Sequence, residues 1–324
     1  ASQPQSVTAL GTAVTAAVTL ARQVNALSAG VQADRLEADG RIASSVSKIN
    51  TALKQVEVLN GQIVGAGSGR DVTALQDQRQ RLVDGIAEHI PLREVQHEDR
   101  RIGLVTPGGT TLLDGKAAVL GFRPVNTVTA GMTVGAGGLS GLTVNGADLP
   151  VASLGGGALG AQFAIRDTLA PEAQTRIEAV SADLVARLQG SGLMERGAGG
   201  GLRVNAALAA EPWRLRDGLD AVGEGPSGDA ARLNGLVAAM SEGRGANAAV
   251  GDLLSATSSA RIVAEDRAAF DSARFGTLRS AELAGGGVDT DAEMTNLLSI
   301  EQAYSANAKV IQEVDQMMKT ILGL

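Results

Sequence analysis

The sequence offers few side chains for catalysis or for metal binding. It has no cysteine and only two histidines, His89 and His97, which lie on either side of Pro91. Thiolate catalysis and cysteine-ligated zinc are therefore excluded, and a histidine site would need a further ligand in a known geometry. The His-Glu-x-x-His spacing of zinc proteases is absent, because the fourth residue after His97 is Arg101. We predict that both histidines are surface residues.

A glycine-rich run from Gly155 to Gly160 matches the GxGxxG pattern of dinucleotide-binding loops. The pattern requires a following parallel strand, with an acidic residue about twenty positions further on. Instead, a second helical stretch and a glycine loop follow. We therefore predict that the run is a hinge between a β unit and a helix. A nucleotide-binding module that uses residues 155–160 remains the less favoured alternative.

The other candidate groups also have simple structural explanations. The Glu98-Asp99 pair is typical of a solvated loop, and Asp289 with Asp291 of a helix cap. The single tryptophan, Trp213, is expected to pack a loop against the body. Because no acid, base and nucleophile occur together, we predict that the protein is not an enzyme and that it uses no cofactor or metal.

Composition points to packed helices. The 324 residues are 44% apolar but only 2% aromatic, so the core must consist of Ala, Leu, Val and Ile. Such side chains suit closely packed long helices better than an aromatic-lined pocket. The net charge of −7 argues against nucleic-acid binding. Residues 1–21 are uncharged, but Ser, Thr and Gln interrupt them, so we predict no membrane span and no cleaved signal peptide.

The first ninety residues have the 3-4 spacing of a helical seam. It is strongest at seven positions: Ile42, Val46, Ile49, Leu53, Val56, Asn60 and Ile63. Gly40 is expected to mark an offset or kink between two helical stretches. A glycine loop at 65–69 ends the rod. Asp71 then caps a second helix, which Pro91 ends.

Residues 92–159 change to short runs rich in Val, Thr and Leu, with Asp114-Gly115 and Asn145-Gly146 as hairpin signals. We predict a small antiparallel β unit with strands at four places: Ile102–Thr106, Thr110–Leu113, Ala117–Phe122 and Leu142–Val144.

Helix is expected to resume near Ala161. A loop at 190–201 and an irregular stretch at 202–228 follow, then helical patterns at 229–241 and 248–284. Three glycines at 285–287 should break the chain before a last amphipathic helix over 289–322.

This last helix carries the candidate interaction site, a heptad seam. Four of its members recur every seven residues, and the other four follow each of these by three: Leu297, Ile300, Tyr304, Asn307, Ile311, Val314, Met318 and Ile321. We predict that these eight residues, the C-terminal seam, pack against other subunits. A polar Asn307 inside the seam would fix its register, so Asn307→Leu should strengthen non-specific association and spoil assembly.

The expected fold class is α+β, mainly α. It is an elongated helical rod or bundle with a small inserted antiparallel β domain and a C-terminal assembly helix. The expected domains are a discontinuous helical domain at 1–91 and 160–287, the inserted β domain at 92–159, and the assembly helix at 288–324.

Several stretches together resemble the flagellar hook-associated protein 1 family, which forms the first junction between hook and filament. The C-terminal part of the likeness lies in Glu293–Leu297, Gln302–Ile311, Asp315–Met317 and Ile321–Leu322. Stretches that occur earlier in the chain, in the family's order, are Ile49–Asn50, Leu59–Ile63, Leu75–Val83, Gly157–Gly160, Ile165–Asp167 and Pro171. Ile300-Glu301 departs mildly from the family pattern, and the β insert is short.

The resemblance implies a structural role in the bacterial flagellum and in motility. It implies export through the flagellar type III system to an extracellular position, without a cleaved signal. The implied partners are hook protein, the second junction protein, copies of the chain in a ring and a cytoplasmic export chaperone, with no nucleic acid or membrane. Ala1 falls inside the family's helical domain, so a fragment that lacks the N-terminal part is expected. The alternative within this class is another axial protein, such as the second junction protein or a flagellin relative.

Overall fold

The computed structural model describes residues 3–67, 70–243, 246–286, 294–295, 297–305 and 309. Contacts divide the chain into two compact units, Ala1–Thr257 and Ser258–Leu324. Helices dominate, and the described strands form three small antiparallel sheets. This confirms the fold class expected from the sequence, α+β and mainly α. The division into three domains stays a prediction.

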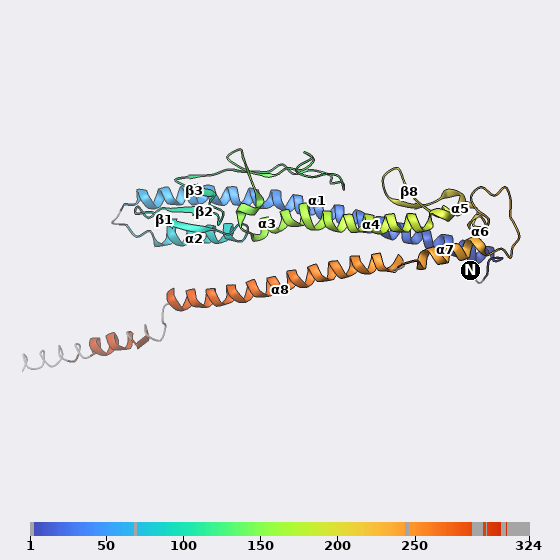
Figure 1. Ribbon diagram of the computed structural model, residues 1–324. Coiled ribbons are helices and arrows are strands. Elements are labelled where there is room, and N and C mark those ends of the chain that lie inside the picture. The colour runs from blue at the N-terminus through green and yellow to red at the C-terminus, as the bar shows by residue number, and fades with distance from the viewer. Residues whose placement is uncertain are drawn as a thin grey trace, which may run out of the picture. The chain divides into compact units, whose positions relative to one another are not determined.

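The longer helices follow one another along the chain (Figure 1) as α1 Val7–Gly65, α2 Thr73–Ala87, α3 Gly157–Ala164, α4 Ala170–Leu188, α7 Ala231–Ser241 and α8 Ala246–Gly286. The short helices are α5 Ala206–Ala210 and α6 Arg214–Asp217. The strands are β1 Arg93–Gln96, β2 Ile102–Val105, β3 Thr111–Asp114, β4 Lys116–Ala117, β5 Leu120–Gly121, β6 Leu142–Val144, β7 Ala147–Leu149, β8 Met194–Arg196 and β9 Leu202–Val204.

Helix α1 is the axis of the first unit. Its 59 residues make a rod of about 90 Å at 1.5 Å per residue. Ser6 caps its start by accepting a hydrogen bond from the Ala9 amide at 3.1 Å. The helix continues through Gly40, so the offset expected there is wrong. Gly40 is exposed, and an added Cβ would find no atom within 4 Å. A glycine at such a position costs a helix only about 1 kcal/mol relative to alanine, while its buried neighbours Ala38 and Ile42 stay packed.

The first core lies between the second half of α1, helices α2 and α3, and two of the sheets. Its fully buried members include Ile49, Leu53 and Ile86. The expected capping residue is wrong by one position: Val72 is the N-cap of α2 and makes no side-chain cap bond. Asp71 lies just before it, and its carboxylate accepts hydrogen bonds from the Thr73 amide at 2.9 Å and the Thr73 hydroxyl at 2.7 Å.

The inserted β unit is antiparallel, as the sequence predicts. One sheet has the order β1-β2-β3-β4, and a second has the order β5-β6-β7. The expected turn between β6 and β7 is confirmed, with Asn145 and Gly146 both at positive φ. Strands β1 and β7 were not expected, and the predicted run Ala117–Phe122 is divided between β4 and β5.

The second core lies between the first half of α1, helices α4 to α7 and the hairpin of β8 and β9 (Figure 1). The sequence predicts only a loop and an irregular stretch between 190 and 228. The structure places β8, β9, α5 and α6 there, so this expectation is wrong. Each of these elements is five residues or shorter, which is too short for a periodic pattern to show.

Helix α1 is long and apolar enough to cross a membrane by length and composition alone, with a mean hydropathy of 1.2 over its best window. It is the one such helix in the described part of the chain. Its inner residues Leu10, Val14 and Val24 pack into the second core. A helix that is buried in the core of a protein can be equally long and apolar.

Helix α8 continues to Gly286, so the chain does not break at the first two of the three glycines. Gly287 and the expected capping residues at 289–291 lie outside the described residues. Within the second unit, α8 carries exposed ion pairs between residues four apart, Arg261 with Glu265 and Arg267 with Asp271. Such pairs are typical of a solvated helix.

Candidate assembly interface

The described part of the C-terminal seam is helical and exposed. Leu297 and Ile300 keep 62% of their surface, and Tyr304 keeps 78%. Residues 297–305 are in helix, as expected. The remaining five seam residues, Asn307, Ile311, Val314, Met318 and Ile321, lie outside the described residues. The role of all eight as a packing site stays a prediction.

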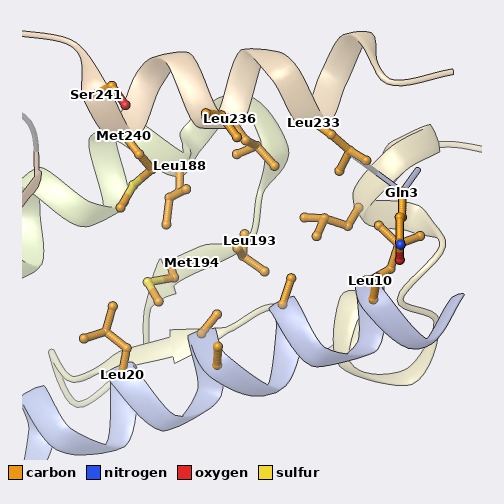
Figure 2. Close-up of a pocket in the computed structure, with 16 residues that line it drawn as sticks. Gln3, Leu10, Leu20, Leu188, Leu193, Met194, Leu233, Leu236, Met240 and Ser241 are labelled. Carbon is orange, nitrogen blue, oxygen red and sulfur yellow. The ribbon is translucent and has the colours of Figure 1, made fainter. Parts of the chain in front are cut away.

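Sequence reasoning missed an apolar cavity of about 550 Å³ in the first unit. Figure 2 shows Leu10 and Leu20 of α1 on one side and Leu233 and Met240 of α7 on the other, with Leu193 between them. The one feature of the sequence that could have indicated this cavity is the uncharged start of α1. Because its lining is apolar except for Gln3 and Ser241, the cavity offers packing contacts rather than groups for chemistry.

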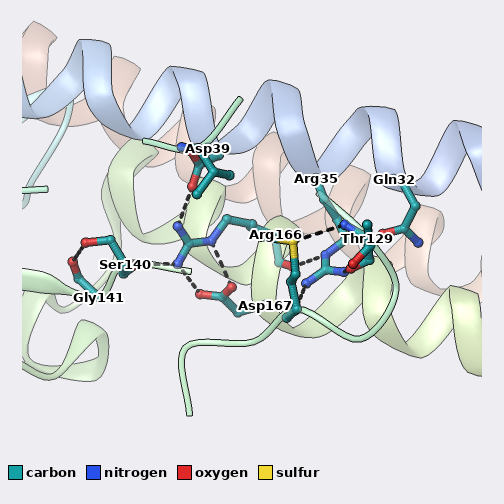
Figure 3. A network of polar contacts seen from close by, with 10 residues as sticks. Gln32, Arg35, Asp39, Thr129, Ser140, Gly141, Arg166 and Asp167 are labelled. Carbon is teal, nitrogen blue, oxygen red and sulfur yellow. Dashed lines mark hydrogen bonds and ion pairs between the residues drawn. The ribbon is translucent and has the colours of Figure 1, made fainter. Parts of the chain in front are cut away.

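A buried ion pair joins α1 to the turn between α3 and α4. Arg166, in a single turn of π-helix at Ile165–Leu169, donates from Nη1 to Asp39 Oδ1 at 2.6 Å, and neither side chain is exposed. It also donates to both oxygens of Asp167 and to the Ser140 carbonyl (Figure 3). Burial alone would lower the pKa of Arg166, but the hydrogen bonds to Asp167 and Asp39 outweigh it and raise that pKa.

A second arginine, Arg35, holds the loop between β5 and β6. It donates to the carbonyls of Thr129 at 3.0 Å, Met132 at 2.6 Å and Arg166 at 2.9 Å (Figure 3). Desolvation by burial lowers its pKa, and the Asp167 charge opposes this. Arg35 and Arg166 therefore fix the long loop of the inserted unit to α1 through backbone carbonyls. Both arginines donate to groups of the chain itself, so the network holds segments of the fold together.

Three asparagines of α1 bind strands in the same way. Asn25 donates from Nδ2 to the Leu202 carbonyl and accepts from the Leu202 amide through Oδ1, both at 2.8 Å. Asn50 makes the same pair of bonds with Leu120, also at 2.8 Å. Asn60 makes them with Ile102, at 2.9 and 3.2 Å. Each side-chain amide makes the same pair of hydrogen bonds, one donated and one accepted, that a neighbouring strand would make. These bonds attach β9, β5 and β2 to α1.

The chain itself occupies the space beside the glycine run Gly155–Gly160. The amides of Ala158 and Leu159 donate to the carbonyls of Glu88 and His89, at 3.4 and 3.0 Å. Gly157 has a φ of +77°, and a Cβ there would lie 2.5 Å from the His89 oxygen. Two amides that a phosphate could use are therefore occupied, and the described strands that follow, β8 and β9, pair antiparallel. This geometry contradicts the nucleotide-binding alternative and fits a hinge.

The two histidines and the tryptophan have separate surroundings in the first unit. His89 and His97 are half-buried rather than fully exposed, so the prediction of surface residues is only partly correct. His97 Nε2 lies 3.6 Å from Asp114 Oδ1. The guanidinium carbon of Arg214 lies 4.5 Å from the centre of the Trp213 ring, which packs beside α6. Among the described residues, no group of three or more His, Asp or Glu side chains could hold a metal.

Comparison with protein families decides the class. The sequence model of the flagellar hook-associated protein FlgK helical domain matches residues 1–191, more than half of the chain. The chain belongs to the FlgK family. The family is one of structural flagellar proteins and not of enzymes. This confirms the resemblance noted in the sequence.

Two further comparisons add to this. The model of the C-terminal part of the flagellar basal body rod FlgEFG proteins matches residues 280–324, which include the whole C-terminal seam. A solved structure of the flagellar hook junction protein FlgK from Burkholderia pseudomallei is 24% identical, with a TM-score of 0.48. The likeness covers 58% of this chain and 34% of that one, so this FlgK-family chain spans about a third of that protein. Among curated proteins, none matches the sequence.

Proposed function

We propose that this FlgK-family chain joins the flagellar hook to the filament, and that the C-terminal seam makes the subunit contacts. The observation that carries the proposal is the match of the FlgK helical domain to residues 1–191. The match of an axial rod C-terminal domain to residues 280–324 supports the placing of the contacts in the last helix.

The exposed seam supplies a physical reason for assembly. Leu297, Ile300 and Tyr304 are each more than half exposed. Burying a large apolar side chain contributes about 1.5–3 kcal/mol. The seven apolar positions of the seam would contribute on the order of 10 kcal/mol before the entropy of ordering is subtracted. A seam of this size can hold a subunit in place without any chemical step.

The finer assignments are part of the same proposal. The partners would be the hook protein, the second junction protein and further copies of this chain in a ring, and a cytoplasmic chaperone would hold the seam before export. The flagellar type III route would deliver the chain to an extracellular position. Repeated use of one seam on identical subunits generates a ring or a helix.

A deletion experiment tests the role. Removing the gene for the full-length protein from a flagellated strain should leave hooks without filaments and flagellin shed into the medium, and the full-length gene should restore filaments. Normal filaments in the deletion strain would contradict a junction role and would favour another axial protein. A complementing gene with Ser299→Asp, which changes an exposed residue outside the seam, should restore filaments as well as the original does.

A further inference from the structure

In the described part of the first unit, the two apolar cores have no residue in common. Along α1, Val24 is the last buried residue of the second core, and Ile42 is the first buried residue of the first core. Four polar side chains of α1 lie between these two positions and bond to α4 or to the π-helical turn before it: Ser28, Gln32, Arg35 and Asp39. A polar layer therefore separates the two cores.

The hydrogen bonds of this layer differ between its two sides. Next to the first core, the Arg35 guanidinium donates to three backbone carbonyls (Figure 3). Next to the second core, α1 and α4 are joined through Gln174, whose Oε1 accepts from Ser28 Oγ at 3.0 Å and from Gln32 Nε2 at 3.1 Å. We call these three residues the glutamine contact. Bonds between neutral groups contribute less than bonds that involve a charge, so the layer is weaker at Gln174 than at Arg35.

Packing is also loose at the glutamine contact. A cleft of about 440 Å³ lies beside it, and Gln32 and Gln174 line this cleft together with Val24 and Ile177. Side chains that line an open space lack partner atoms on that side, so they lose dispersion contacts. The two helices α1 and α4 are therefore held more weakly between the cores than within either of them.

The second core is less tightly packed than the first. Most buried members of the first core, such as Ile49 and Leu53, keep 1% or less of their surface exposed. In the second core, Leu208 has no exposed surface, and the other buried members keep 3–8%. The cavity of about 550 Å³ also belongs to the second core. Empty space lowers the stability of a core, so the second core is expected to be the less stable of the two.

We propose that the glutamine contact is the boundary of a partial opening, in which the second core comes apart as one unit while the first core stays folded. Proteins open in cooperative units, and weakly packed regions open at the lowest free energy. The first half of α1 would lose its packing together with the hairpin of β8 and β9, α7, and the part of α4 that follows Gln174. Arg35 and its carbonyl partners would stay in place. This opening concerns the first unit alone and does not depend on the role proposed for the C-terminal seam.

Hydrogen exchange of the full chain in urea, well below the unfolding midpoint, tests the opening. Amides of residues 10–24 in α1 should exchange with the same urea dependence as amides of residues 177–188 in α4. Amides of residues 42–63, in the same helix, should exchange at least about tenfold more slowly. One common rate at both ends of α1 would overturn the proposal. A gradual change along the helix would also overturn it, because that pattern indicates fraying from the helix end.

Substitutions within the cores test whether they open separately. Ile49→Val removes one carbon from the first core, so it lowers only the free energy of complete unfolding. Exchange of residues 42–63 should become about two- to tenfold faster, and exchange of residues 10–24 should not change. Val180→Ala in the second core should make both segments faster, because that core is disrupted in both openings. An effect of Ile49→Val on both segments would mean a single cooperative unit and would contradict the proposal.

Two further variants locate the boundary. Gln174→Ala removes the acceptor of Ser28 and Gln32, so residues 10–24 should exchange about two- to tenfold faster. Arg35→Lys weakens bonds that stay intact during the opening, so it should leave this exchange unchanged. Faster exchange of residues 10–24 in Arg35→Lys would rule out a boundary at the glutamine contact. Gln23→Ala, which changes an exposed glutamine of α1, is the control and should have no effect on either segment.

Discussion

Arg166 and Asp39 are 127 residues apart in the sequence, yet their side chains meet at 2.6 Å with no exposure to solvent. The pair connects the middle of α1 to the π-helical turn Ile165–Leu169, which precedes α4. It is also the point at which the inserted β unit rejoins the helices, because Arg166 holds the Ser140 carbonyl. One buried contact therefore fixes three segments of the first unit.

Removing one member of this pair should destabilise the first unit strongly. Asp39→Ala leaves the Arg166 charge buried without Asp39 and also removes the acceptor of the Val125 amide. We expect a loss of about 3–5 kcal/mol in the free energy of unfolding, measured with urea. Glu37→Ala is the control, since its pair with Arg41 is about 60% exposed on both sides, and it should cost about 0–1 kcal/mol. Equal losses would contradict the structural role of Asp39.

The asparagine contacts should be separable by hydrogen exchange. Asn25→Ala removes the acceptor of the Leu202 amide, so exchange at that amide should become faster, with a stability loss of about 1–3 kcal/mol. The Leu120 amide, which Asn50 holds, should keep its local protection. Asn50→Ala should produce the reverse pattern. A uniform increase at both amides would indicate global unfolding instead.

Two glycine substitutions in helix α3 should have opposite effects on the stability of the protein. Gly157→Ala places a Cβ 2.5 Å from the His89 oxygen at a φ of +77°, and the backbone strain alone costs about 1–3 kcal/mol. Gly160→Ala meets no atom within 4 Å inside helix α3 and should stabilise it by about 0.5–1 kcal/mol. Thermal unfolding compares the two. A stable Gly157→Ala variant would contradict the close contact at the hinge.

Seam substitutions should separate assembly from folding. Tyr304→Asp changes a side chain that is 78% exposed, so the urea unfolding of the chain should change by less than about 0.5 kcal/mol. The same change should prevent filament attachment in a complemented strain, because a charge in the seam cannot be buried. Filaments of normal number and strength would mean that Tyr304 does not pack against a neighbour.

Acid stability should depend on Asp217. The hydrogen bond from Arg216 is the largest cause that lowers the pKa of Asp217 below its ordinary value. A carboxyl with a lowered folded-state pKa contributes stability above its unfolded pKa of about 3.9, and this is lost as the pH falls through the folded pKa. Unfolding of Asp217→Asn should therefore depend less on pH between about pH 5 and pH 2. An unchanged pH profile would argue against the pair.

Local signals in the sequence predicted the elements that carry a repeating pattern. The spacing from Ile42 to Ile63 predicted the second half of α1, and Asn145-Gly146 predicted a turn that the structure confirms. The prediction failed at Gly40, where packing on either side outweighs the low helix propensity of one glycine. It also failed for β8 and β9, because a strand of three residues cannot show alternation.

The sequence by itself determined the helical stretches, the β insert, the absence of cysteine chemistry and the likeness to a flagellar family. These follow from periodicity, composition and motifs, which are properties of neighbouring residues. Only the tertiary structure decided that Asn25 binds Leu202, 177 residues away, and that Arg166 meets Asp39. The physical reason is that a buried polar group needs a hydrogen-bond partner, and the fold can supply it from any part of the chain. The number of residues between two partners therefore does not indicate that they are in contact.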